Sequence, residues 1–385
     1  MTETRIKRAK PDIRAITRLV PPEGNLVQGQ SELPIDPALA AEAAYVIAAN
    51  NNHYGPSEGD SALRNAVAEK IARFNGVKVD PAQRQLMITS GGTGALIGIA
   101  QAFLTGHSAL VFEPYYPYHR RILEEFGSRA ETFELNEELA FDGKRFFERC
   151  RELKLRKDFP LAAIIVCTPA NPTGKVMTES ELQIIADAAQ EFDLLVISDE
   201  VYEHYVTAEQ QHVSIAVLPD MFERTITVNS FSKSWNISGW RLGYTFGPER
   251  HIARINSIAN VVYVCPATPL QSALASVLMK DPGYYHRLEE SFNGKREFVA
   301  SQLRQLDFEL FESGSAFYIW ARIPRQFSDA VAFNEMLMRD AGVGLTPGSA
   351  FADSERWDAY VRICIAREDR ILHSAIEKIR SVLNR

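Results

Sequence analysis

Apolar positions along the middle of the chain follow two different spacings. Between residues 62 and 74 they recur every three or four positions, which predicts an amphipathic helix that begins at Asp60 or Ser61. Between residues 161 and 167 they form a short continuous run, which is typical of a strand buried on both faces of a sheet. The middle of the chain therefore contains both covered strands and helices with one apolar face.

Strand and helix signals alternate through this part of the chain. Further strands are predicted at residues 85–89, 108–112, 194–198 and 225–228. Helices are predicted at residues 91–104 and, starting with a capping box at residues 178–181, on to about residue 192. This alternation predicts an α/β fold with a mostly parallel sheet that helices cover on both faces. Ligands bind at the ends of the strands in such sheets.

The pattern changes from about Pro282 onward, where a long polar helix is followed by strands mixed with helices. This change predicts a smaller α+β domain, which the N-terminal segment helps to complete. We therefore expect residues 1–45 to form an N-terminal arm and part of the small domain. Residues 46–280 would form the large cofactor-binding domain and residues 281–385 the small C-terminal domain.

The overall composition is that of an ordinary globular protein. Of the 385 residues, 46% are apolar and 24% are charged, and the net charge is −7. This acidic balance argues against a general nucleic-acid-binding protein, and no uncharged apolar run is long enough to cross a membrane. The start of the chain is basic but lacks the apolar core of a secretory signal. We expect its cationic residues to form an arm that is solvated or contacts a partner: Arg5, Lys7, Arg8, Lys10 and Arg14.

The cysteines and histidines give no sign of a disulfide framework or a metal site. Cys150, Cys167, Cys265 and Cys364 are far apart and form no Cys-x-x-Cys pair. The eight histidines make no ligand pair at helical spacing, so no metal is expected. Reduced cysteines, two of them in apolar strand-like runs, indicate a cytoplasmic protein.

The candidate chemistry centres on Lys233, which follows a predicted strand within the sequence Ser-Phe-Ser-Lys. A lysine at the end of a buried strand is costly to keep charged, and its amine can form a Schiff base with a carbonyl. Ser230, Ser232 and, about two helical turns on, Arg241 suit a phosphate. An aldehyde that carries a phosphate is pyridoxal phosphate. A surface lysine in a turn is the alternative interpretation.

A glycine loop lies between a predicted strand and a predicted helix. Gly91, Gly92 and Thr93 would present backbone amides and a hydroxyl at a helix N-terminus, which is suited to binding an anion. The same loop resembles a dinucleotide-binding loop, with Glu113 about twenty residues on as the ribose ligand. An NAD(P)-dependent oxidoreductase would explain these two features but not Lys233.

Three further polar residues follow predicted strands. Asp199 ends one strand, where its carboxylate could hold a pyridine ring protonated and so make the ring an electron sink. Tyr202 lies one helical turn on and could reach the same ligand. Asn171 lies in an Asn-Pro-Thr-Gly turn and could donate to a phenolate oxygen, although a turn needs no ligand.

Taken together, residues 25–367 resemble the fold-type I, pyridoxal-phosphate-dependent aminotransferases of class I/II, such as the aspartate, aromatic and kynurenine aminotransferases. The resemblance implies their fold, in which helices enclose a mostly parallel sheet of seven strands beside a smaller α+β domain. It also implies transfer of an amino group between an L-amino acid and a 2-oxo acid, with pyridoxal 5′-phosphate as cofactor.

The resemblance assigns roles to individual residues. Lys233 would carry the cofactor as a Schiff base and move the proton between the substrate α-carbon and the cofactor. Asp199 would pair with the ring nitrogen, Asn171 and Tyr202 with the phenolic oxygen, and Tyr116 would stack on the ring. The residues that would hold the phosphate are Gly91, Gly92, Thr93, Ser230, Ser232 and Arg241.

Other matching positions concern the substrate and a second subunit. Arg362 matches the arginine that binds the α-carboxylate, with Gly29 and Asn171 at the same end. Tyr54 resembles the tyrosine that reaches the phosphate of the neighbouring subunit, which implies a homodimer with shared active sites. Val27, Gln28, Tyr116 and Tyr263 are expected to line the side-chain pocket, with core packing an equally good interpretation for Tyr263.

Other reactions and substrates stay open at this point. The same machinery serves lyases, cyclases resembling 1-aminocyclopropane-1-carboxylate synthase, and oxidases. A cofactor-binding regulatory domain is a further alternative, although such proteins carry a DNA-binding module that would precede the matched region. A dicarboxylate substrate needs a second arginine that faces its side chain, and the sequence does not identify one.

Overall fold

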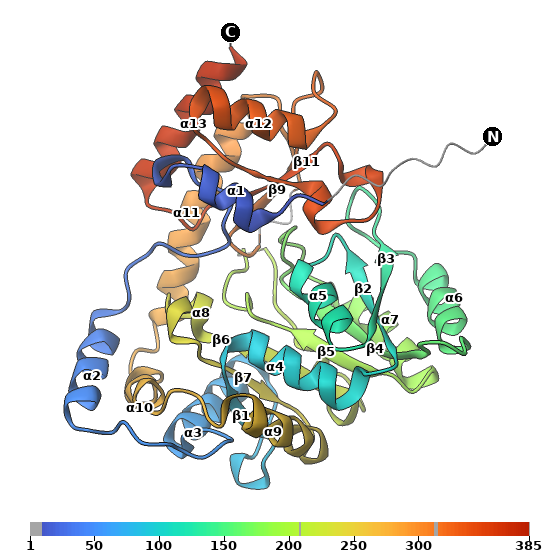
Figure 1. The fold of residues 1–385 in the computed structure, drawn as a ribbon, viewed down its shortest axis with the longest axis vertical. Coiled ribbons are helices and arrows are strands. Elements are labelled where there is room, and N and C mark those ends of the chain that lie inside the picture. Colours follow the sequence, from blue (N-terminus) through green and yellow to red (C-terminus); the bar gives the residue numbers. More distant parts are fainter. Residues whose placement is uncertain (1–9, 208, 312–314, 385) are drawn as a thin grey trace.

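The computed structural model describes residues 10–207, 209–311 and 315–384, which form a seven-stranded and a four-stranded sheet with surrounding helices (Figure 1). The large sheet has the strand order β1-β7-β6-β5-β4-β2-β3. Its strands are β1 (Leu86–Thr89), β2 (Ser108–Glu113), β3 (Arg129–Glu134), β4 (Leu161–Cys167), β5 (Leu195–Asp199), β6 (Thr225–Ser230) and β7 (Gly243–Phe246). Only β7 pairs antiparallel, with β1 and β6. The predicted mostly parallel sheet is confirmed.

Alternate residues of each central strand face opposite layers of helices. In β2, Leu110 and Phe112 pack into the apolar cluster that also contains the buried faces of α6 (Gly143–Lys154) and α7 (Glu179–Glu191). Ala109 and Val111 point the other way, into a cluster with α4 (Gly91–Ile99), α5 (Pro117–Glu125) and α9 (Glu249–Tyr263). Burial on both faces explains why these strands have continuous apolar runs.

Two helix predictions are confirmed, with one difference at a boundary. Thr178 caps α7 with the predicted box, in which its hydroxyl accepts from Glu181 and the Glu181 carboxylate accepts in return. Asp60 caps α3 (Ser61–Lys70), which continues into a π-helical turn at Ile71–Asn75. The predicted helix at residues 62–74 therefore exists, but its last turn is wider than an α-helical turn.

Two strands of the large sheet escaped the sequence analysis. β3 is the edge strand, and its charged residues are partly exposed, so it shows no continuous apolar run. β7 has only four residues and begins at a glycine. β3 pairs only with the preceding strand β2, and β7 pairs with the preceding strand β6 and with the distant β1, so both depend on tertiary pairing that local patterns do not reveal.

The second sheet forms with helices from both ends of the chain. It has the order β10-β11-β9-β8, all antiparallel: β10 (Thr346–Pro347), β11 (Tyr360–Cys364), β9 (Tyr318–Arg322) and β8 (Glu309–Leu310). In Figure 1 its strands lie with the N-terminal α1 and with α11, α12 and α13, above the large sheet. The remaining helices are α1 (Ile13–Leu19), α2 (Pro37–Ala48), α8 (Phe231–Ser234), α10 (Thr268–Val277), α11 (Tyr284–Arg304), α12 (Ala330–Ala341) and α13 (Asp369–Leu383).

Residues 25–30 of the N-terminal segment form hydrogen bonds with β11 and its neighbouring loops. Leu26 donates its amide to the carbonyl of Gly344 at 3.1 Å and accepts from the amide of Cys364 at 2.9 Å. The buried guanidinium of Arg367 donates to the carbonyls of Asn25, Gln28 and Gln30 at 2.6, 3.0 and 2.8 Å. The division of the chain at residues 45 and 280 stays a prediction.

Among the described helices, none has the length and apolar character to cross a bilayer.

Candidate active site

A cavity of about 890 Å³ lies at the C-terminal ends of the parallel strands, where the loops of the large sheet face β9, β11 and the N-terminal segment. Twelve of the fourteen residues assigned to the site line it. They are Gly29, Gly92, Thr93, Tyr116, Asn171, Asp199, Tyr202, Ser230, Ser232, Lys233, Arg241 and Arg362. The fold therefore brings together residues from widely separated segments, although their chemical roles stay predictions.

Lys233 lies in α8, the single helical turn that follows β6. The hydroxyl of Ser230 starts this turn by accepting from the amide of Ser232 at 3.1 Å. The amine of Lys233 donates to the carbonyl of Gly29 at 2.8 Å. Burial lowers the pKa of Lys233 to about 8. A useful share of this amine is therefore uncharged, and so nucleophilic, near neutral pH.

Asp199 ends β5 with its carboxylate buried in the cavity wall. Its Oδ2 lies 2.7 Å from Nε2 of His119, and its Oδ1 accepts from the amide of Val201 at 3.3 Å. His119 was missed by the sequence analysis, although it lies one helical turn after Tyr116, whose ring it meets edge to face at 5.3 Å. A buried carboxylate that is fixed in this way suits a protonated ring nitrogen.

The anion-binding end of the cavity is built around Gly91, where α4 begins. Gly91 has a φ of +68°, and a Cβ there would lie 2.5 Å from Nη2 of Arg241, so only glycine leaves room for that guanidinium. The hydroxyl of Ser230 donates to that of Ser232 at 2.8 Å. Helix amides, two hydroxyls and a guanidinium form a set of donors that fits a phosphate dianion.

Arg362 in β11 is positioned at the opposite end, 3% exposed. Its Nη1 donates to Oδ1 of Asn171 at 2.8 Å and its Nη2 to the carbonyl of Val27 at 2.6 Å. Its guanidinium packs over the rings of Tyr318 and Phe351, at 4.5 and 4.8 Å. The buried Nε has no hydrogen-bond partner among the described residues. An unused donor on a fixed arginine is what a substrate carboxylate requires.

Tyr318 is a second wall residue that the sequence analysis missed, because it reads only as part of an apolar strand. Its hydroxyl lies 2.7 Å from that of Tyr202. A Cβ at Gly29 would lie 2.1 Å from the same hydroxyl, which explains the glycine at that position. Burial raises the pKa of both tyrosines above their usual value, so both keep their protons and can donate.

Several expected residues lie elsewhere. Gly91 lies against the guanidinium of Arg241 and does not line the cavity. Tyr54 lies in the α2–α3 connection with 86% of its surface exposed. Val27 is buried beneath the wall. Tyr263 does not line the cavity and packs against an apolar core cluster, which is the second of its two interpretations. Its ring packs near Gly94, and its hydroxyl is buried without a partner among the described residues. The described part of the basic arm is also not simply solvated, because Arg14 lines the cavity.

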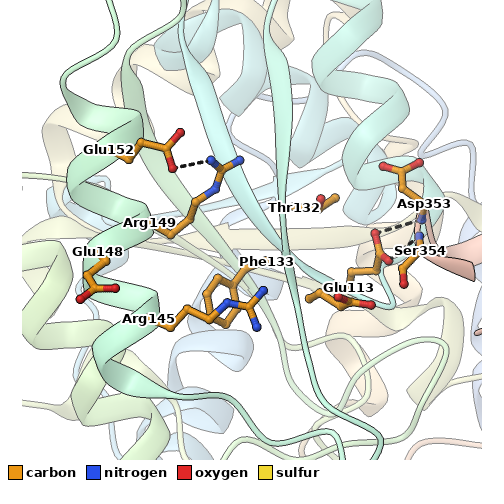
Figure 2. A pocket seen from close by; sticks show the side chains of 10 residues that line it. Glu113, Thr132, Phe133, Arg145, Glu148, Arg149, Glu152, Asp353 and Ser354 are labelled. Carbon is orange, nitrogen blue, oxygen red and sulfur yellow. Dashed lines mark hydrogen bonds and ion pairs between the residues drawn. The ribbon is translucent and has the colours of Figure 1, made fainter. Parts of the chain in front are cut away.

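Glu113 does not take the position of a ribose ligand. Its two carboxylate oxygens accept from the backbone amides of Asp353 and Ser354, both at 2.9 Å, so it ties the large sheet to the loop before β11. Glu113 borders a separate hollow of about 630 Å³ that α6 and β3 also line (Figure 2). The feature that supported a dinucleotide is thus a structural contact.

One cluster of possible metal ligands was also not foreseen. Glu200, Glu203 and His212 place ligand atoms within 4.8 Å of one another among the described residues. The amine of Lys70 already forms an ion pair with Glu203, and His212 lies 3.1 Å from Glu200. The carboxylates of Glu203 and Glu200 therefore already have partners within the protein, and we assign no metal to this cluster.

The cavity as a whole fits pyridoxal phosphate. The amine of Lys233 could take the aldehyde, Asp199 the ring nitrogen, and Asn171 and Tyr202 the phenolic oxygen. The donors around Gly92 and Arg241 would take the phosphate. The fit rests on the space that glycine leaves beside Arg241 and on the unused Nε of Arg362.

Comparison with known proteins gives a consistent result. The family profile of aminotransferase class I and II matches residues 23–379. The aspartate aminotransferase of Pyrococcus abyssi is 34% identical over 86% of this chain and 84% of its own length. The aromatic-amino-acid aminotransferase 2 of Thermococcus litoralis is 35% identical over 86% and 84%. The structure of N-succinyldiaminopimelate aminotransferase from Mycobacterium tuberculosis superposes with a TM-score of 0.90, at 28% identity, over 99% of both chains.

Proposed function

The chain belongs to the aminotransferase class I and II family, and we propose that the cavity around Lys233 is the site of its reaction. It is a pyridoxal-phosphate-dependent transaminase, like the relatives named above. Because these relatives are aminotransferases, the lyase, cyclase and oxidase alternatives have no support of their own. The fold is that of the aspartate aminotransferases.

In this proposal each residue of the cavity has a separate role. When bound, pyridoxal phosphate supplies an electron sink that makes the α-proton of an amino acid acidic. Arg362 binds the α-carboxylate through its free Nε and so orients the α-carbon. Asp199, which His119 holds in place, would stabilise a positive charge on the ring nitrogen. Lys233 would hold the aldehyde group of the cofactor, and its Nζ, once free of the cofactor, would take up the α-proton.

The observation that carries the proposal is the meeting of five polar side chains, of four chemical kinds, in one cavity. Lys233, Asp199, Asn171, Arg241 and Arg362 come from five separate segments and all line the same space. Core packing alone gives no reason to bring an amine, a carboxylate and two guanidinium groups to one hollow, because buried charges are costly.

Single-turnover absorbance measurements test the proposal. Each of the twenty amino acids is mixed with the purified holoprotein, and the cofactor spectrum is followed as the amine form appears and a 2-oxo acid is released. We expect conversion with at least one amino acid, and loss of conversion in Lys233→Ala. A wild type that converts no amino acid, or a Lys233→Ala protein that converts one normally, would contradict the assignment.

We also propose that the working unit is a homodimer with shared sites. Tyr54 is 86% exposed and does not line the cavity around Lys233, so a second copy would bring it to a phosphate. Large apolar side chains are exposed on the neighbouring α2 and on α9, with Tyr45 at 70% and Val261 at 86%. Exposed groups of this kind mark protein interfaces.

Complementation between two inactive variants tests the shared site. Tyr54→Ala and Lys233→Ala are mixed and their subunits are allowed to exchange. A mixed dimer has one site with both defects and one site with neither, so activity should return. Mixtures that stay inactive while sedimentation shows exchanged dimers would refute sharing.

The four unpaired cysteines further suggest that the enzyme works in the cytoplasm.

A further inference from the structure

A cluster of buried polar side chains lies against the end of β6, outside the cavity. Its centre is the carboxylate of Glu203, which is 2% exposed and forms an ion pair with the amine of Lys70. The Nδ2 of Asn75 donates to Oε2 of Glu203 at 2.6 Å, and the hydroxyl of Tyr244 donates to Oε1 at 3.3 Å. None of these four residues lines the cavity. Because burying charges is costly, their presence here calls for a physical reason.

Asn229, the residue before Ser230 in β6, joins this cluster to the candidate active site. The Nδ2 of Asn229 donates to Oε1 of Glu203 at 2.7 Å and to the carbonyl of Glu200 at 3.1 Å. The Oδ1 of Asn229 accepts from the backbone amide of Ser230 at 2.7 Å. Ser230 in turn caps α8, the short helix that carries Lys233. A chain of hydrogen bonds therefore links the buried ion pair to this turn.

The partners of Asn229 determine which way its side-chain amide points. The carboxylate of Glu203 and the carbonyl of Glu200 can only accept, so they require the NH2 group on their side. The backbone amide of Ser230 can only donate, so it requires the oxygen on the other side. Burial acts to raise the pKa of the Glu203 carboxyl, but the charge of Lys70 opposes this and the pKa lies below its usual value. An ionised acceptor strengthens the bond from Asn229.

Stability alone is a poor reason for an ion pair at this position. Two buried charges lose much of their attraction to the cost of removing them from water, and apolar residues of similar volume often stabilise a fold as well. From the contacts of this pair we propose that Glu203 is a positioning residue of the enzyme, which acts through Asn229 to hold the turn that carries Lys233. The inference rests on the proposed function, because that function makes this turn part of the cofactor site.

Two double variants separate positioning from stability. Lys70→Met/Glu203→Gln and Lys70→Met/Glu203→Leu both remove the two charges together, so neither leaves a buried charge unpaired. Glutamine and leucine are similar in size, but only glutamine keeps an oxygen that can accept from Nδ2 of Asn229. The glutamine variant is thus the matched control for the leucine variant.

The affinity for pyridoxal phosphate is measured by absorbance titration of the cofactor-free proteins, and denaturant titration measures their stability. We expect the glutamine variant to bind the cofactor within about threefold of the wild type. We expect the leucine variant to bind it about tenfold more weakly, which is the effect of one lost hydrogen bond. In the holoenzymes, hydrogen exchange followed by mass spectrometry should be faster for the β6–α8 peptide of the leucine variant than for that of the glutamine variant.

Equal cofactor affinity and equal exchange in the two double variants would overturn the proposal. Asn229→Leu keeps the ion pair and removes the link itself, so it tests the same idea should the double variants fail to fold. It should also bind pyridoxal phosphate about tenfold more weakly, and binding as tight as that of the wild type would overturn the proposal. A wild type that binds no pyridoxal phosphate would instead refute the proposed function.

Discussion

The lowered pKa of Lys233 predicts how the protein without cofactor reacts with pyridoxal phosphate as pH changes. Burial lowers this pKa from 10.5 to about 8, because the cavity wall solvates the ammonium poorly. At pH 7 about one molecule in eleven then has the neutral amine, against about one in three thousand for an ordinary lysine. The difference of 2.5 pH units makes the amine about 300-fold more available.

The assay is stopped-flow absorbance of the cofactor-free protein mixed with pyridoxal phosphate between pH 6 and pH 10. Because only the neutral amine reacts, we expect the rate to rise tenfold per pH unit up to about 8 and to level off above it. Lys233→Ala measures the background from the other lysines. A rate that keeps rising without a break up to pH 10 would refute the idea that burial sets the reactivity of this lysine.

Four further predictions concern other positions. Arg362→Lys removes the guanidinium that donates to Asn171 and Val27 and should raise KM for the amino acid by about 10- to 100-fold in steady-state kinetics. His119→Phe leaves Oδ2 of Asp199 without its 2.7 Å partner and should slow the half-reaction about tenfold or more, with partial recovery in His119→Gln. Gly174→Ala places a Cβ 2.3 Å from the carbonyl of Ser315 at a φ of +74° and should cost at least about 1–3 kcal/mol of unfolding free energy by denaturant titration. Gly294 lies in the middle of α11, where a Cβ would have no atom within 4 Å. Gly294→Ala should therefore raise the unfolding free energy by about 0.5–1 kcal/mol in the same titration.

Local signals predicted the fold where local physics decides the structure. The continuous apolar run of β4 and the capping box of α7 were found because burial and capping leave a mark within a few residues. β7 was missed because its four residues form a strand only between β1 and β6. The π-helical turn at Ile71–Asn75 also has no distinct signature in the sequence.

The candidate site shows the same division. Lys233 and Asp199 could be singled out because a charged side chain that ends an apolar strand is conspicuous in the sequence. His119 and Tyr318 look like ordinary core residues, and their importance comes from contacts with Asp199 and Tyr202, which lie far away in the chain. Arg14 was expected in an arm that is solvated or contacts a partner, because nothing in residues 1–20 indicates that this segment lines the cavity.

The hydrogen bonds from Arg367 to residues 25–30 have a practical consequence for anyone who shortens the protein. This guanidinium is 2% exposed, and three backbone carbonyls from the beginning of the chain satisfy it. Trimming the first thirty residues as a dispensable leader would remove these three acceptors and leave Glu32, at 3.2 Å, as the ion-pair partner of Arg367. It would also remove the carbonyl of Gly29 that Lys233 contacts. Residues 25–30 and Arg367 therefore depend on each other, and any shortened or redesigned version of the protein should keep both.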